Sequence, residues 1–235
     1  MSGLEGRAAL ITGASRGIGA SVARALARAG AKVALASRTG TDLGIEGSVA
    51  AACDVRDPEA LAALAREASE RFGGLDIAVA NAGVGAYGSF LDLAPDVVEE
   101  IVDVNVKGLL NTVRATLPHL LESEAGDLVA IASIAGHRAP EGEAVYAASK
   151  FAQVGFMRSL DHELWDRGVR CSILCPGGVA TDFAMGRGRT PDDPDLDGMM
   201  HPDEVAAAVV HALTRPPTHR LFEASLLPMN EDSLG

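Results

Sequence analysis

The stretch RAALITGASRGIG, residues 7–19, joins a short apolar run, a glycine-rich turn and an alanine-rich helical segment that reaches about Gly30. A strand, a glycine loop and a helix in this order form the setting in which proteins bind a dinucleotide pyrophosphate. Gly13 permits a tight turn, Gly17 lets the backbone approach the phosphates, and Gly19 lets the helix pack closely on the strand. The first amides of that helix would point at the phosphates, where the helix dipole favours negative charge.

The spacing of this turn is G-x-x-x-G-x-G, and alone it also fits an ordinary strand-to-helix connection. The rest of the chain adds a regular alternation of predicted elements. Apolar runs predict strands at 8–11, 32–36, 48–52, 76–80, 127–132, 170–175 and 221–227. Helical patterns fall at 17–29, 58–72, 95–122, 144–166 and 202–213. The alternation predicts an α/β fold, a single domain over residues 1–235 with a doubly wound parallel sheet of Rossmann type.

Candidate binding residues follow the predicted strand ends, at Gly13, Asn81, Ser133 and Pro176. Ligands in doubly wound folds bind beyond the carboxyl ends of the strands, so these residues should line one cleft. One connection departs from the alternation, because residues 39–47 carry three glycines and no amphipathic period. We expect the helix between the second and third strands to be missing or reduced to a turn, which leaves that end of the cleft less enclosed.

Tyr146 and Lys150 lie four residues apart in a predicted helix, so they share one helical face. A cation beside a phenol favours the phenolate, and we expect the pKa of Tyr146 to fall below its reference of about 10. Such a tyrosine can pass a proton to or from a substrate oxygen. Taken alone, the pair is equally typical of a solvated helix surface.

Together these motifs resemble the classical short-chain dehydrogenase/reductase family, from about Leu4 to about Pro228. The matching segments are Thr12-Gly13-x-x-x-Gly17-x-Gly19, Asp54, Asn81-Ala82-Gly83, Asn105-Val106-Lys107-Gly108, Ser133, Tyr146-x-x-x-Lys150 and Pro176-Gly177-Gly178-Val179-Ala180-Thr181. Seven motifs in the family's order are far more specific than any one of them.

The resemblance implies strand order 3-2-1-4-5-6-7 and hydride transfer between a nicotinamide and a carbonyl or secondary alcohol. Tyr146 would exchange the proton, Lys150 would bind the nicotinamide ribose, and Ser133 would donate to the substrate oxygen. Asn105 would hold a water that links Lys150 to solvent. The implied catalytic set is Asn105, Ser133, Tyr146 and Lys150. The implied cofactor-binding set is Gly13, Ser15, Arg16, Gly17, Ile18, Gly19, Ser37, Arg38, Asp54, Val55, Asn81, Ala82, Gly83, Tyr146, Lys150, Pro176, Gly177, Val179 and Thr181.

The end of the second predicted strand indicates NADP rather than NAD. NAD sites commonly place an acid there to accept hydrogen bonds from the ribose, but this chain has Ser37 and Arg38. A guanidinium suits a 2′-phosphate, and Arg16 of the glycine loop could reach the same group. Two solvated arginines are the plainer interpretation.

The substrate pocket is the least determined part of the sequence. By position, residues 83–87, 134–138 and 177–178 should border it, with a mobile lid near 181–200. Candidate walls are Tyr87, His137, Phe183 and Met185, although structural packing explains Phe183 and Met185 equally well. Arg187 and Arg189 could meet an anionic substrate group, but lid arginines are more often solvated.

Bulk properties narrow the function further. The net charge of −12 argues against nucleic acid and anionic membrane surfaces as partners. The start of the chain lacks a signal-peptide pattern, no apolar run is long enough to span a bilayer, and the three cysteines fit a reducing compartment, so we expect a cytoplasmic protein. No cluster has metal-ligand spacing. Relatives associate through the segments at 95–122 and 144–166, which implies a homodimer or homotetramer.

An NADP-dependent carbonyl reductase or alcohol dehydrogenase explains these features best. A 3-hydroxy acid dehydrogenase and a 3-oxoacyl thioester reductase are alternatives within the family. An acidic carrier protein as partner fits the net charge poorly, although Arg138, Arg187 and Arg189 could form a local basic patch. A non-catalytic NADPH-sensing regulator is the alternative from another class, and the presence of all four catalytic residues weakens it.

Overall fold

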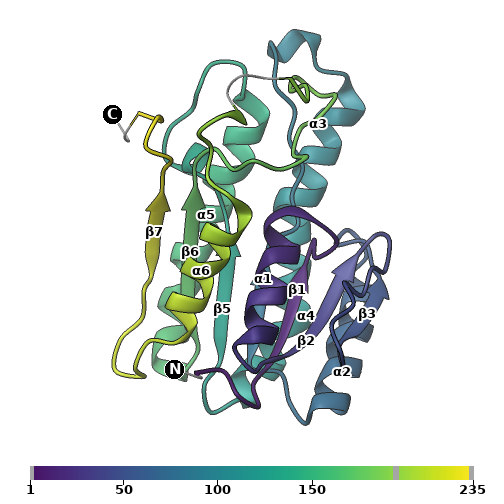
Figure 1. Ribbon diagram of the computed structural model, residues 1–235, viewed down its shortest axis with the longest axis vertical. Coiled ribbons are helices and arrows are strands. Elements are labelled where there is room, and N and C mark those ends of the chain that lie inside the picture. The colour runs from purple at the N-terminus through teal and green to yellow at the C-terminus, as the bar shows by residue number, and fades with distance from the viewer. Residues whose placement is uncertain (1–2, 193–195, 233–235) are drawn as a thin grey trace.

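Seven parallel strands form one sheet in the order β3-β2-β1-β4-β5-β6-β7, which confirms the predicted topology (Figure 1). The computed structural model describes residues 3–192 and 196–232. The strands are β1 (Ala8–Thr12), β2 (Lys32–Ser37), β3 (Val49–Ala52), β4 (Ile77–Ala80), β5 (Asp127–Ile131), β6 (Arg170–Pro176) and β7 (Glu223–Leu226). All residues of β1, β4 and β5 are buried, because helices cover both faces of the sheet.

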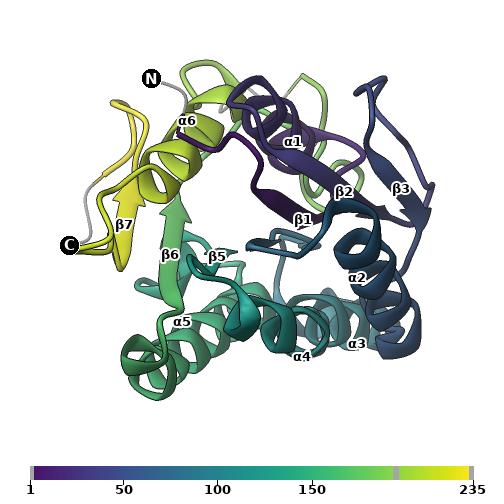
Figure 2. The ribbon, with the colours of Figure 1, turned by 90° about the horizontal axis from the view of Figure 1, so that it is seen from below.

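Helices lie in one layer on each face of the sheet (Figure 2). One layer holds α1 (Gly17–Arg28) and α6 (Pro202–Leu213), which pack against each other and share a core with β1 and β2. The opposite layer holds α2 (Pro58–Phe72), α3 (Pro95–Val102), α4 (Gly108–Glu122) and α5 (Ala144–Leu164). The described residues also contain short 3-10 turns at η1 (Phe90–Asp92), η3 (Ile134–Gly136) and η4 (Trp165–Arg167).

The connection between β2 and β3 contains no helix within the described residues, as the glycine content predicts. Leu43 and Ile45 from this connection pack against the core beside α1 and partly take the place of a helix. Arg24 of α1 donates a hydrogen bond to the carbonyl oxygen of Leu43 at 2.9 Å. The second and third strands are therefore joined by a loop that packs beside α1 where a helix would otherwise lie.

The segment predicted as one helix at 95–122 is three consecutive pieces. A π turn, η2 (Asp103–Lys107), separates α3 from α4 and places Asn105 at its centre. The Asn105 side chain is fully buried; its Oδ1 accepts from Val84 N–H at 2.8 Å and its Nδ2 donates to Val84 carbonyl at 2.9 Å. These two bonds fix the wider turn, and π turns are frequent at functional sites.

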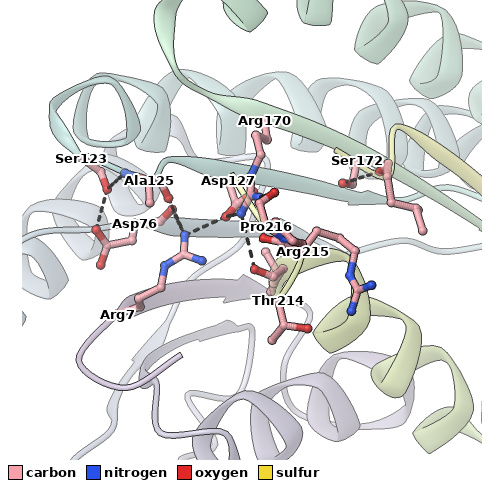
Figure 3. A network of polar contacts seen from close by, with 12 residues as sticks. Arg7, Asp76, Ser123, Ala125, Asp127, Arg170, Ser172, Thr214, Arg215 and Pro216 are labelled. Atoms are coloured by element: carbon pink, nitrogen blue, oxygen red, sulfur yellow. Dashed lines mark hydrogen bonds and ion pairs between the residues drawn. The ribbon is translucent and has the colours of Figure 1, made fainter. Parts of the chain in front are cut away.

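A network of charged residues closes the amino ends of the strands (Figure 3). Asp127, which is buried, accepts hydrogen bonds at 2.8 Å from Arg7 and from Arg170. Asp76 accepts from the Ala8 N–H at 2.8 Å and from the Ser123 hydroxyl at 2.6 Å. The predicted binding residues lie at the other edge of the sheet, so this network concerns stability rather than ligand binding.

Two further expectations concern the chain as a whole. Within the described residues, none of the helices combines the length and the apolar character that crossing a bilayer requires.

All three cysteines, Cys53, Cys171 and Cys175, are buried free thiols. The four-residue offset of Cys171 and Cys175 along β6 keeps them apart, as the strand geometry predicts.

Candidate active site

A cavity of about 870 Å³ lies at the carboxyl ends of the central strands. Its volume is in the range of small-molecule and cofactor sites. The predicted site residues that line it are Gly13, Ser15, Arg16, Gly17, Ile18, Ser37, Arg38, Asp54, Val55, Asn81, Ala82, Gly83, Ser133, Tyr146, Lys150, Pro176, Gly177, Val179 and Thr181. Two predicted residues, Gly19 and Asn105, lie behind the lining instead, and each supports a residue in it.

The glycine loop has the geometry that a pyrophosphate requires. Gly13 has a φ of +67°, and a Cβ there would lie 2.9 Å from the Cα of Ala82. A Cβ on Gly19 would collide with the Gly13 carbonyl, so α1 can approach the loop only because residue 19 is glycine. No side chain of the described residues caps α1 at Arg16, and its first turn holds no acid. Its first amides are therefore left for an anionic ligand.

Thr12 and Asn81 tie the glycine loop to the end of β4. The Thr12 hydroxyl accepts hydrogen bonds from the backbone N–H groups of Asn81 at 3.1 Å and Ala82 at 3.2 Å. The Asn81 side-chain amide donates to the Thr12 carbonyl at 2.9 Å. These contacts connect the last residue of β1 and the glycine loop to the residues after β4 at the floor of the cavity.

Two exposed arginines stand at the rim beside the end of β2. The side chain of Arg38 is 64% exposed with Nη1 3.8 Å from Glu100, and that of Arg16 is 67% exposed with Nη1 3.5 Å from Asp182. Asp54 carries a firmer partner, since the Arg56 side chain donates to it at 2.7 Å and lowers the pKa of its carboxyl. Arg16 and Arg38 are thus only loosely paired at this rim, and their side chains can turn toward a phosphate.

Ser133, Tyr146 and Lys150 converge at the other end of the cavity. Ser133 follows β5, and Tyr146 and Lys150 project from one face of α5, as the four-residue spacing predicts. The Lys150 Nζ lies 5.5 Å from the centre of the Tyr146 ring, and both side chains are buried. Three groups distant in the sequence therefore face one small volume.

The expected fall in the pKa of Tyr146 is wrong for this structure. Burial raises the pKa of the phenol above its ordinary value, and a hydrogen bond with Ser133 opposes that rise only in part. Burial also lowers the pKa of Lys150 to about 8. The lysine lies over the ring face, where its effect on the phenolate is smaller than the loss of hydration.

Gln153 is a buried polar residue that motif reasoning missed. Its Oε1 accepts a hydrogen bond from Lys150 Nζ at 3.0 Å, and its Nε2 donates to the Asn105 carbonyl at 2.6 Å. The resemblance assigns a water to the position between Asn105 and Lys150, and in this chain a side-chain amide spans the two. The i, i+3 spacing from Lys150 was the available signal.

The walls of the substrate end match the predictions only in part. Tyr87 and Phe183 line the cavity, and the Phe183 ring lies 5.4 Å from that of Tyr146. His137 and Met185 are absent from the lining among the described residues. His137 turns toward β6 and β7, with its Nε2 3.2 Å from Cys175 Sγ and 3.1 Å from Glu223.

The lid arginines divide between the two sides of the segment at 181–200. Arg187 forms an ion pair with Glu100 at 2.6 Å outside the cavity, whereas Arg189 lines it and lies over the Tyr87 ring. The backbone of Tyr87 donates to the Arg187 carbonyl at 2.8 Å and so holds this part of the segment down. Residues 193–195 of the predicted lid lie outside the described residues.

The end of the chain supplies a further wall that the sequence did not indicate. Pro228, Asn230, Glu231 and Asp232 follow β7 and line the cavity beside Arg138. Their side chains belong to no motif, and only the tertiary path after β7 brings them to the cavity.

Comparison with known proteins decides the family of this fold and cavity. The family model described as short chain dehydrogenase matches residues 7–192. The chain belongs to the short-chain dehydrogenase family. This short-chain dehydrogenase is 39% identical to oxidoreductase UcpA of Escherichia coli K12 over 206 residues, which cover 83% of the chain and 78% of UcpA.

Solved structures of two dehydrogenases extend the similarity over nearly the whole chain. An alcohol dehydrogenase from Thermococcus sibiricus, complexed with 5-hydroxy-NADP, is 33% identical with a TM-score of 0.85, covering 97% of this chain and 98% of that one. A short-chain dehydrogenase from Mycobacterium paratuberculosis bound to NAD is 30% identical with a TM-score of 0.84, covering 95% and 97%. The protein is thus an oxidoreductase of the NAD(P)-dependent dehydrogenase/reductase class.

Proposed function

We propose that this enzyme transfers hydride between NADP(H) and a carbonyl compound or secondary alcohol, with Tyr146 as general acid and base. The observation that supports this proposal most directly is the convergence of Tyr146, Lys150 and Ser133 at one end of a cavity whose other end is a glycine loop. The loop has the form that a pyrophosphate fits, and the catalytic trio lies where the reactive ring of a dinucleotide would end.

When bound, the nicotinamide supplies or accepts the hydride. Tyr146 then gives its phenolic proton to the carbonyl oxygen during reduction and takes it back during oxidation. The Ser133 hydroxyl donates to the same oxygen and stabilises the charge that develops there. Because burial favours the neutral phenol, the ammonium of Lys150 supports the transient phenolate at the moment of proton transfer.

The preference for NADP is a separate part of the proposal. Ser37 is buried and places no carboxylate at the end of β2, so nothing at this position would repel a 2′-phosphate. Arg38 and Arg16 flank that position with exposed guanidinium groups. The remaining lining residues of the glycine loop, β4 end and β6 end would hold the rest of the dinucleotide, with residues 181–200 as a lid.

The experiment that tests the reaction is NADPH oxidation against a panel of ketones, followed by the absorbance of the reduced nicotinamide. We expect Tyr146→Phe to lose at least about a hundredfold in kcat, since a positioned general acid contributes that much. NADPH binding to the variant should stay close to that of the parent enzyme. Normal turnover by Tyr146→Phe would contradict the role of Tyr146 as general acid.

A further inference from the structure

The carboxylate of Glu231 lies inside the cavity, held by donors from two distant parts of the chain. Its Oε2 accepts a hydrogen bond from the backbone N–H of Gly178 at 2.7 Å, and its Oε1 pairs with Arg138 Nη2. Arg138 also donates through Nη1 to the carbonyl of Asp232 at 2.8 Å. The segment after β7 is thus fastened to the loop after β6 and to the residues after η3.

The protein backbone is shaped around this carboxylate. A Cβ on Gly177 would overlap the Glu231 carboxylate, so a glycine at residue 177 leaves the space that this side chain occupies. We call the site formed by Arg138, Gly177 and Gly178 around this carboxylate the Glu231 seat. The side chains of Arg138 and Glu231 are 24% and 21% exposed, which separates this pair from the solvated ion pairs of the surface. The Asn230 side chain donates to the Asp197 carbonyl at 3.3 Å and ties the same segment to residues of the lid.

Acids outnumber bases around the catalytic trio. Among the described residues, the charged side chains that line this end of the cavity, besides Lys150 of the trio, are Arg138, Arg189, Glu141, Glu143, Glu231 and Asp232. Burial raises the pKa of Glu143, and that carboxyl lies in the field of Arg138, Arg189 and Glu231. Because Glu231 already neutralises Arg138, an entering carboxylate would meet an engaged guanidinium and several like charges. Like-charge contact in a partly desolvated site is unfavourable.

We propose that Glu231 is a specificity-determining residue that makes this cavity select neutral carbonyl compounds over those that carry a carboxylate. This inference rests on the proposed function for the reaction and adds the charge class of the substrate. A 3-oxo ester or simple ketone places no charge against Glu231. A 3-oxo acid must displace Glu231 from Arg138 and Gly178 or stand beside it.

Methyl acetoacetate and acetoacetate make a matched pair for the test, because they differ in the charge of one terminal group. The ratio of kcat/KM for the acid to that for the ester is measured with NADPH in the parent enzyme and in Glu231→Gln. We expect the parent to favour the ester and the variant to raise the acid-to-ester ratio about tenfold or more. Glutamine keeps the shape and an acceptor for Gly178, so folding should be preserved.

Two additional variants show whether the seat itself is responsible. The double variant Glu231→Gln/Arg138→Met also removes the Arg138 guanidinium, which Glu231→Gln leaves without its carboxylate partner. The rise in the acid-to-ester ratio of kcat/KM should then disappear. Glu141→Gln removes another lining carboxylate that is not part of the seat, and its ratio should change much less. An equal gain in Glu141→Gln, an unchanged ratio in Glu231→Gln, or a parent enzyme that favours acetoacetate would each overturn the inference.

A binding measurement keeps this inference separate from the proposed reaction. Calorimetric affinities of the acid and the ester for the NADPH complex of Tyr146→Phe, with and without Glu231→Gln, need no hydride transfer. If the parent enzyme reduces neither compound, the proposed function fails for this pair. The role of Glu231 is then decided by the ratio of the two affinities, acid to ester. This ratio should rise when Glu231→Gln is added to Tyr146→Phe, and an unchanged ratio would overturn the inference.

Discussion

The side-chain oxygen of Gln153 accepts a hydrogen bond from the ammonium of Lys150 at 3.0 Å, one helical turn along α5. The other end of the same amide donates to the Asn105 carbonyl in the π turn. Lys150 is buried and its Nζ also donates to the Ile131 carbonyl at 3.3 Å. The position of the proposed catalytic lysine is therefore set in part by a residue outside every recognised motif.

Changing Gln153 should move the pH profile of reduction in opposite directions for two variants. Gln153→Leu removes an acceptor that stabilises the ammonium, so the pKa of Lys150 should drop from about 8 to a lower value. The activity is lost as the pH rises and the ammonium gives up its proton, so in this variant the loss should begin at a lower pH. Gln153→Glu places a carboxylate beside the ammonium and should move the fall to higher pH. The pH dependence of kcat/KM measures both shifts, and profiles that coincide with the parent's would limit Gln153 to packing.

Replacing Lys150 by methionine should change the stability of the protein in a pH-dependent way. Burial lowers the pKa of Lys150 from 10.5 to about 8, so between these values the unfolded chain binds more protons than the folded one. The lysine therefore destabilises the fold below pH 8, and this cost disappears as the pH rises toward 10.5. Methionine carries no proton and has no such dependence.

The check is the difference in unfolding free energy between Lys150→Met and the parent at pH 7 and at pH 10. Raising the pH should shift this difference in favour of the parent by up to about 3 kcal/mol. Lost hydrogen bonds add a constant that does not vary with pH. A difference that stays level across this window would show that Lys150 titrates normally in the folded enzyme.

Arg38→Asp should move the cofactor preference toward NAD. The Arg38 side chain is 64% exposed at the cavity rim, and the variant puts a carboxylate in its place. This carboxylate should repel a 2′-phosphate and accept hydrogen bonds from the ribose hydroxyls. The ratio of kcat/KM for NADPH to that for NADH should fall by about tenfold or more. Arg28→Asp on α1 makes the same charge change away from the cavity and serves as control. NADPH kinetics in Arg38→Asp that match the parent would reject the assignment.

Asp127→Asn should destabilise the fold without weakening NADPH binding. Asp127 is buried at the amino end of β5, and its loss leaves the guanidinium groups of Arg7 and Arg170 without their shared carboxylate. The expected loss in unfolding free energy is about 3 kcal/mol, by denaturant titration. Asp166→Asn removes an exposed acid with the same charge change and should cost no more than about 0.5 kcal/mol. Equal stabilities of the two variants would contradict a structural role for the network.

The elements and motifs were predictable because each depends on local patterns. Pro58 and Pro202 predict the starts of two helices, and the structure has helices that begin at these residues. The glycines of residues 39–47 predict that no helix joins β2 to β3, as observed. The grouping of Ser133 with Gly13, Asn81 and Pro176 also followed, since strand ends of a parallel sheet meet at one edge. Tyr146 was joined to this group by the family resemblance.

Features that depend on packing were not predictable from the same patterns. The π turn at Asn105 arises from two hydrogen bonds to Val84, a residue of another segment. The orientation of His137 away from the cavity depends on Cys175 and Glu223, and no periodicity in residues 134–138 encodes it. The pKa of Tyr146 depends on how completely it is buried, which a helical spacing does not reveal.

The contact between α1 and α6 joins the first helix of the chain to the last. Leu26 of α1 shares one core with Val209 and Leu213 of α6, so an apolar face built early in synthesis is covered only when the last helix emerges. Until then the nascent chain exposes that face to other molecules, and such exposure promotes aggregation. Truncations that remove α6 should accordingly yield insoluble protein.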